Sequence, residues 1–158
     1  MTVAIDTNIL FDILLSHQEY KDTSLELILY YSETERLIIS EIVYSELASQ
    51  FDDVELLNSF LNDSNIMLEP TSQRGLWFAS RAWKKYNKIR DNNLQCTKCG
   101  YKQQVKCEKC REILTGKQHI ISDFIIGGHA IEKTDTLLTR DLGFYRNYFD
   151  ELKIVSEV

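Results

Sequence analysis

Four acidic residues that lie far apart in the sequence each follow, or lie close behind, a short apolar segment typical of a β-strand. In an open parallel sheet the carboxyl ends of the strands share one edge, where ligands bind. Carboxylates brought together there repel one another unless a hard divalent cation neutralises them, and such oxygen ligands suit Mg²⁺ or Mn²⁺. The pattern therefore predicts metal-assisted phosphodiester hydrolysis. The four residues are Asp6, Glu46, Asp123 and Asp141.

The segments that carry these acids alternate between strand-like and helix-like, which predicts an α/β fold with a parallel sheet. Two helices show an apolar face, formed by Leu25, Ile28 and Leu29 in one and by Leu76, Ala79, Trp83 and Tyr86 in the other. We expect strands at 2–5, 37–39, 66–68, 135–139 and 153–155, and helices at 8–15, 19–31, 41–50, 54–61 and 73–90.

The residues around the four acids resemble the motifs of PIN-domain ribonucleases, a family that includes VapC-type toxins and nucleases of ribosomal RNA maturation. The similarity runs from residue 2 to about residue 155, apart from one insertion. It implies a three-layer α/β/α fold with a parallel five-stranded sheet, and a Mg²⁺- or Mn²⁺-dependent endoribonuclease activity. The similar segments are Val3-Ala4-Ile5-Asp6-Thr7-Asn8-Ile9-Leu10, Glu41-Ile42-Val43-Tyr44-Ser45-Glu46-Leu47, Ser122-Asp123-Phe124-Ile125-Ile126-Gly127-Gly128-His129-Ala130 and Leu137-Leu138-Thr139-Arg140-Asp141-Leu142-Gly143-Phe144-Tyr145.

The resemblance also assigns roles within the site. Asp6 is the central metal ligand, Asp123 and Asp141 complete the ligand set, and Glu46 binds directly or through water. Asn8 and Thr139 orient the acids without binding the metal themselves. Hydrolysis of this type leaves 5′-phosphate and 3′-hydroxyl ends, because it needs no RNA 2′-hydroxyl.

Each acid also has a simpler explanation. Asp6 and Asp141 follow strands, where many aspartates cap the next helix. Glu46 has acidic neighbours in the sequence and suits an exposed helix face. Asp123 is the hardest of the four to explain in this way, because isoleucines and a phenylalanine surround it in the sequence and an unpaired buried acid is costly.

The four cysteines of the chain lie in an insertion at 92–116, as two Cys-x2-Cys pairs separated by seven residues. This spacing predicts a tetrahedral zinc site with a structural role, since four thiolates leave no position for a reactive water. An iron site, two disulfides or free thiols are the alternatives. The pairs are Cys96 with Cys99 and Cys107 with Cys110.

The net charge of −6 is unevenly distributed. Residues 74–117 contain twelve Lys and Arg against three acids, a net charge of +9, so the rest of the chain carries −15. A basic face of this kind suits RNA, although it also serves solubility alone. The residues that we predict to contact RNA are Arg81, Lys84, Lys85, Lys88, Lys98, Tyr101 and Lys102.

We therefore expect a nuclease domain formed by 1–91 and 117–158, with a zinc finger at 92–116. The activity suits either a toxin with an antitoxin partner or an RNA-processing enzyme with a partner of its own. A non-catalytic RNA-binding or assembly module is the alternative. A homodimer is compatible with Tyr30, Tyr31 and Phe51 as contacts. The lack of a signal-like segment or a long apolar run favours a cytoplasmic protein without a membrane anchor.

Overall fold

The computed structural model describes residues 1–15, 19–89, 93–95, 101–114 and 119–157. Its centre is a sheet of five strands, all parallel, in the order β3-β2-β1-β8-β9. This confirms the predicted PIN-like α/β fold with a parallel five-stranded sheet. In that order, the strands span Ile66–Leu68, Arg36–Ile39, Thr2–Ile5, Thr136–Leu138 and Lys153–Val155.

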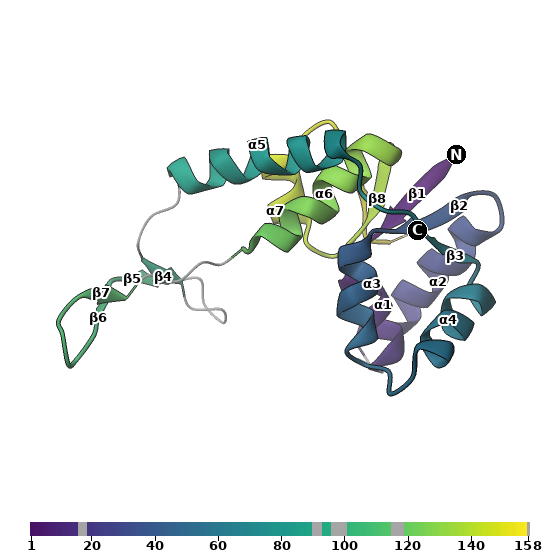
Figure 1. Ribbon diagram of the computed structural model, residues 1–158, viewed down its shortest axis with the longest axis horizontal. Coiled ribbons are helices and arrows are strands. Elements are labelled where there is room, and N and C mark those ends of the chain that lie inside the picture. Colours follow the sequence, from purple (N-terminus) through teal and green to yellow (C-terminus); the bar gives the residue numbers. More distant parts are fainter. Residues whose placement is uncertain (16–18, 90–92, 96–100, 115–118, 158) are drawn as a thin grey trace.

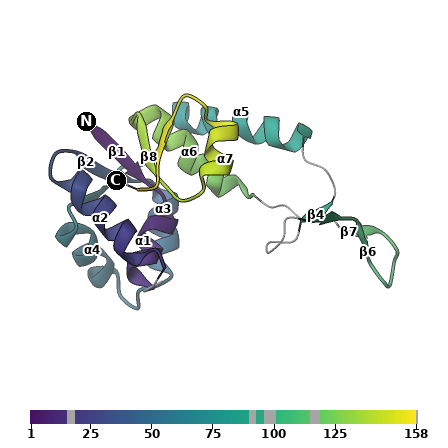
Figure 2. The same cartoon turned by 180° about the vertical axis from the view of Figure 1, so that it is seen from behind.

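Helices cover both faces of this sheet. Consecutive residues of a strand point to opposite faces, yet Leu37, Ile38 and Ile39 of β2 are all fully buried. Helices α1 to α4 gather around one end of the sheet, and α5 to α7 pack together at the other (Figures 1 and 2). The helices of the described residues are α1 (Thr7–Leu14), α2 (Lys21–Ser32), α3 (Glu41–Ala48), α4 (Val54–Asp63), α5 (Gln73–Ile89), α6 (Ile121–Lys133) and α7 (Leu142–Tyr148).

Two of the predicted apolar faces were partly wrong. In α2 the buried residues are Ser24, Leu27 and Ile28, whereas Leu25 and Leu29 are 38% and 55% exposed. In α5, Leu76 is 44% exposed, because the buried face runs through Gly75, Ala79, Ala82 and Tyr86. Ala79 and Tyr86 were predicted correctly, and Trp83 packs against the core, so only Leu76 was misplaced. Small residues on this face let α5 lie against α6, and an apolar pattern does not single them out.

The insertion forms two short antiparallel pairs of its own, β4 with β5 and β6 with β7, and none of these strands joins the central sheet. Figure 1 shows them beyond the end of α5, away from the five-stranded sheet. None of the helices in the described part of the chain has the length and apolar character needed to span a bilayer. The four strands are Leu94–Gln95, Lys102–Gln103, Val105–Lys106 and Ile113–Leu114.

The packing of α6 on α5 depends on a glycine at position 128. A Cβ atom at this position would lie 2.3 Å from the Gly75 carbonyl oxygen and 2.8 Å from the Ala79 nitrogen. Both are backbone atoms of α5, so a change of rotamer cannot relieve the overlap. We expect Gly128→Ala to lower the free energy of unfolding by about 1–3 kcal/mol, measured by urea denaturation.

The matched control is Gly143→Ala in α7, where an added Cβ meets no atom within 4 Å. That change should leave stability unchanged or raise it by about 0.5–1 kcal/mol, because alanine favours a helix over glycine. Equal effects of the two substitutions would contradict the close contact between the helices.

Candidate metal centre

Asp6 lies directly after β1, at the edge of the sheet where the parallel strands end, and is 6% exposed. Its Oδ2 atom accepts hydrogen bonds from the Asn8 side-chain amide at 2.6 Å and from the Thr139 hydroxyl at 2.6 Å. The Asn8 amide also donates to Thr139 at 3.0 Å. The Asp6 side chain makes no capping hydrogen bond to α1, so the helix-cap explanation does not account for it.

Burial raises the pKa of Asp6 to about 6. Hydrogen bonds from the Thr139 side chain and the Thr7 backbone oppose the increase, whereas the negative charges of Glu46 and Asp123 add to it. Asp6 therefore occupies a position where a carboxylate charge is costly in the protein alone.

The other three acids reach the same region from separate helices. Ser40 follows β2 and caps α3 through the Val43 amide at 3.3 Å, and this helix presents Glu46 to the Thr7 hydroxyl, which donates to it. Asp141 follows β8 and accepts from the Phe144 amide at 3.0 Å, so it does cap α7. The predicted second role of Asp141, in metal binding, remains a prediction.

Asp123 lies in the first turn of α6, where its Oδ2 atom accepts from the Ile120 backbone amide at 3.0 Å. Its side chain is 34% exposed, and Ile120 and Ile121 are 56% and 45% exposed. The expected apolar surroundings of Asp123 were therefore wrong: only Phe124 beside it is fully buried. The His119 Nδ1 atom lies 3.7 Å from Asp123 Oδ2, and its ring stacks on Phe144.

Tyr145 is a site residue that sequence reasoning missed, although it belongs to the fourth motif and lies one helical turn after Asp141. It is 2% exposed. Burial raises the pKa of Tyr145 well above its usual value, and so do the charges of Asp6, Asp123 and Asp141 and a hydrogen bond with Asp6. The hydroxyl thus stays protonated and donates toward the acidic site.

Replacing Tyr145 with Phe should raise the pKa of Asp6 by about one unit, because the charged carboxylate loses a donor. Carboxyl carbon NMR titration of Asp6 without added Mg²⁺ or Mn²⁺ measures this. Tyr148→Phe, one turn nearer the end of α7, is the control and should leave the value near 6. The same Asp6 pKa in all three proteins would contradict the role of Tyr145.

Most of the predicted RNA contacts that the structure describes lie on α5. Arg81, Lys84, Lys85 and Lys88 are exposed and follow the three- and four-residue spacing of one helix face. Lys85 is engaged with α7, because its Nζ donates to the Asn147 carbonyl at 2.9 Å. Tyr101 is 67% exposed. Lys98 and the Lys102 side chain lie outside the described residues.

The described residues include half of the predicted zinc site, because Cys96 and Cys99 lie outside them. Cys107 and Cys110 lie in the turn between β6 and β7. The backbone amides of Cys110 and Lys109 and the Cys110 thiol lower the pKa of Cys107. Arg111, directly after Cys110, adopts a left-handed conformation with φ 64°, which is uncommon for a residue other than glycine.

Among the described residues, no three His, Cys, Asp or Glu side chains lie close enough together to hold a metal ion as they stand. The four acids thus interact through their charges and do not form a ready set of metal ligands. Of these four residues, only Asp6 is held by a network of hydrogen bonds.

No protein-family model matches the sequence, and no curated protein sequence matches it significantly. Solved structures do match, and they share the PIN-like fold over nearly the whole chain. One is a chain of VapBC2 from Rickettsia felis bound to a promoter DNA fragment, with 18% identity, 98% coverage of both chains and a TM-score of 0.61. Others belong to VapBC-1 from Haemophilus influenzae (15% identity, TM-score 0.62) and FitAcB from Neisseria gonorrhoeae (13%, 0.58). Each of these two covers 98% of this chain and 97% of the matched one. At these identities the similarity establishes the fold.

Proposed function

We propose that the protein is a metal-dependent endoribonuclease that hydrolyses RNA phosphodiester bonds at the site formed by Asp6, Glu46, Asp123 and Asp141. The observation that carries this proposal is the buried Asp6 carboxylate, which is held by two donors on one oxygen and has a pKa raised to about 6 by burial and by neighbouring acids. A divalent cation removes that cost.

The residues fit Mg²⁺ or Mn²⁺. The donor set consists of carboxylate oxygens, the ligands that both ions favour. Mg²⁺ keeps several water ligands and needs only one or two carboxylates, so three acids in direct contact are not required. Asp6 is the residue that we assign as the central ligand, with Glu46, Asp123 and Asp141 binding directly or through water.

When bound, the metal lowers the pKa of a water molecule and stabilises charge on the phosphate. Asn8 and Thr139 hold the Asp6 carboxylate in one orientation, and Thr7 does the same for Glu46. The exposed cations of α5, namely Arg81, Lys84 and Lys88, supply phosphate contacts outside the acidic site.

The test is cleavage of a mixed pool of structured RNAs by wild type and Asp6→Asn, with Mg²⁺, Mn²⁺ or EDTA. We expect cuts with 5′-phosphate ends that need added metal and disappear in the variant. Cyclic phosphate ends, or full activity in the variant with its fold intact, would overturn the proposal. Tight RNA binding without cleavage would instead support the non-catalytic RNA-binding module.

The biological setting that we favour is a toxin with a protein antitoxin, because the fold matches chains of VapBC-type complexes over almost their full length. The hairpin insertion supports an RNA-processing role instead, since it adds a surface for a dedicated RNA or partner. Tyr30 is 57% exposed and remains a candidate contact for a homodimer. A small DNA-binding protein encoded beside this chain would support the toxin role.

We further propose that the insertion binds structural zinc through all four cysteines. The backbone amides that face Cys107 stabilise its thiolate, which is the form that binds zinc. Elemental analysis of purified protein should find about one zinc per chain, reduced to background by Cys107→Ser. The control Lys109→Ala keeps its backbone amide and should keep the metal. Iron, or no metal in the wild type, would contradict this assignment.

A further inference from the structure

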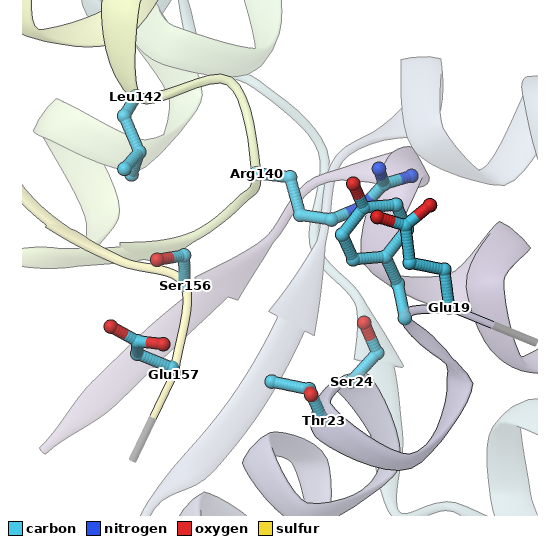
Figure 3. A pocket seen from close by; sticks show the side chains of 8 residues that line it. Glu19, Thr23, Ser24, Arg140, Leu142, Ser156 and Glu157 are labelled. Carbon is cyan, nitrogen blue, oxygen red and sulfur yellow. The ribbon is translucent and has the colours of Figure 1, made fainter.

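A cavity of about 460 Å³ lies beside the candidate metal centre, between the start of α2 and the carboxyl ends of β8 and β9 (Figure 3). Its volume falls within the roughly 300–1,000 Å³ range of small-molecule sites. The side chains that matter here are Tyr20, Thr23, Arg140, Leu142, Ser156 and Glu157.

Arg140 forms a fixed wall of this cavity. One guanidinium nitrogen lies 2.7 Å from Oδ1 of the buried Asp12, and the guanidinium group stacks on the Tyr20 ring at 4.4 Å from its centroid. Asp12 is the one acceptor that the guanidinium contacts among the described residues, so further N–H groups remain for a ligand. The side chain is 34% exposed and is therefore accessible from the cavity.

The cavity shares this wall with the acidic site. The Arg140 backbone amide donates to Asn8 Oδ1 at 3.1 Å, and the Asn8 side-chain amide donates in turn to Asp6. Arg140 also immediately precedes Asp141 in the sequence. A group bound in the cavity is therefore adjacent to a phosphodiester bound at the candidate metal centre.

The charge of the cavity excludes a phosphate as its ligand. Glu19, Glu157 and the buried Asp12 outnumber the single cation Arg140, which leaves a net charge of −2. Glu19 interacts with the Tyr20 hydroxyl, whereas Glu157 is exposed on the other side of the cavity (Figure 3). The cavity thus offers the Glu157 carboxylate, with the Ser156 hydroxyl beside it, on one side, and the Arg140 guanidinium with Glu19 on the other (Figure 3). Thr23 contributes a hydroxyl to the lining between these two sides.

We propose that this cavity binds a guanine base of the RNA next to the cleaved bond. Guanine carries two neighbouring N–H donors that one carboxylate accepts together, and its O6 and N7 atoms accept from arginine. Adenine and cytosine each offer one amino group, and uracil offers a single N–H between two carbonyls, so they match this arrangement less well. The inference rests on the proposed nuclease function and adds base specificity to it.

The test measures binding of the four 5′-mononucleotides to the wild-type protein by ¹H–¹⁵N NMR, without added Mg²⁺ or Mn²⁺. All four share the phosphate, so differences in affinity report the base. We expect GMP to bind roughly tenfold more tightly than the others and to shift the signals of Thr23, Arg140 and Ser156. Glu157→Gln should remove that preference, and the exposed Glu151→Gln should keep it.

Equal binding of the four nucleotides, or shifts confined to other parts of the chain, would overturn the guanine assignment. So would displacement of GMP by micromolar spermidine, because the cavity would then be a cation site. The outcome is separable from the nuclease proposal. RNA cleavage without base preference refutes only the proposed guanine site. Guanine binding by a protein that never cleaves RNA refutes only the proposed nuclease function.

Discussion

Asp6→Asn is expected to make the metal-free protein more stable while it abolishes RNA cleavage. The pKa of Asp6 is raised from 3.8 to about 6, chiefly by burial. The higher pKa in the folded protein means that proton binding by Asp6 stabilises the folded state. This contribution is fully present only below pH about 4, where Asp6 is protonated in both the folded and the unfolded protein. That contribution is lost as the pH rises through about 6, and its size is about 3 kcal/mol, at 1.36 kcal/mol per pKa unit.

Asparagine carries no charge, so it avoids this cost at neutral pH and can still accept from Asn8 and Thr139. Urea denaturation at pH 7.5 should show a gain of up to about 3 kcal/mol that shrinks as the pH falls toward 4. The exposed Asp63→Asn is the control and should change stability by less than about 0.5 kcal/mol at either pH. Equal stability of Asp6→Asn and wild type at pH 7.5 would contradict an energetic cost of the buried Asp6 charge.

Asp6→Asn should lower the rate of RNA cleavage although it raises stability. In the proposed role of Asp6 as the central ligand, its loss removes several kcal/mol of transition-state stabilisation, so the rate should fall at least about a thousandfold. Gain of stability with loss of turnover is the result expected of a site that is arranged for a ligand rather than for the fold. Asp63→Asn should cleave RNA at the wild-type rate.

Arg140→Ala is expected to be the most destabilising single substitution that removes a charge. Asp12 is fully buried, and its two oxygens contact Arg140 at 2.7 Å and the Ser24 hydroxyl at 2.7 Å. Removing the guanidinium leaves a buried carboxylate with one hydrogen bond, which costs about 3–5 kcal/mol. Stacking of Arg140 on Tyr20 is lost as well.

Chemical denaturation of Arg140→Ala beside Arg146→Ala measures this effect. Arg146 is exposed on α7, so its removal should cost less than about 0.5 kcal/mol. Changing Asp12 to Ala together with Arg140 should recover a large part of the loss, because no unpaired charge is then buried. A double variant as unstable as Arg140→Ala alone would show that the pair does not act through charge.

The sheet was predictable from the sequence because its strands are fully buried. Continuous apolar runs such as 37–39 leave few alternatives to a strand at the centre of a parallel sheet. Asp6 follows one such run directly, and Asp141 lies three residues after the end of another. The position of Asp6 and Asp141 at the carboxyl ends of two strands was therefore predictable. The number of strands and their parallel arrangement were implied by the family resemblance, whereas the strand order is known only from the structure, because spacing alone does not determine it.

Other features depend on contacts that spacing does not encode. The Asp12–Arg140 pair joins residues 128 positions apart, and neither residue belongs to a pattern that predicts the other. Tyr145 belongs to the fourth motif, yet its hydrogen bond with Asp6, 139 positions away, is known only from the folded chain. On α5 only Leu76 was misplaced, because Gly75 and Ala79, rather than a large apolar side chain, meet α6.

The most direct test of the account is Mn²⁺ binding to the metal-free acidic site, followed by electron paramagnetic resonance. Strong chelators are omitted, so that the proposed cysteine site keeps its zinc. We predict that wild-type protein and Asp63→Asn bind Mn²⁺, that Asp6→Asn loses this binding, and that excess Mg²⁺ displaces the ion. Identical Mn²⁺ binding by wild type and Asp6→Asn would contradict a metal centre organised around Asp6.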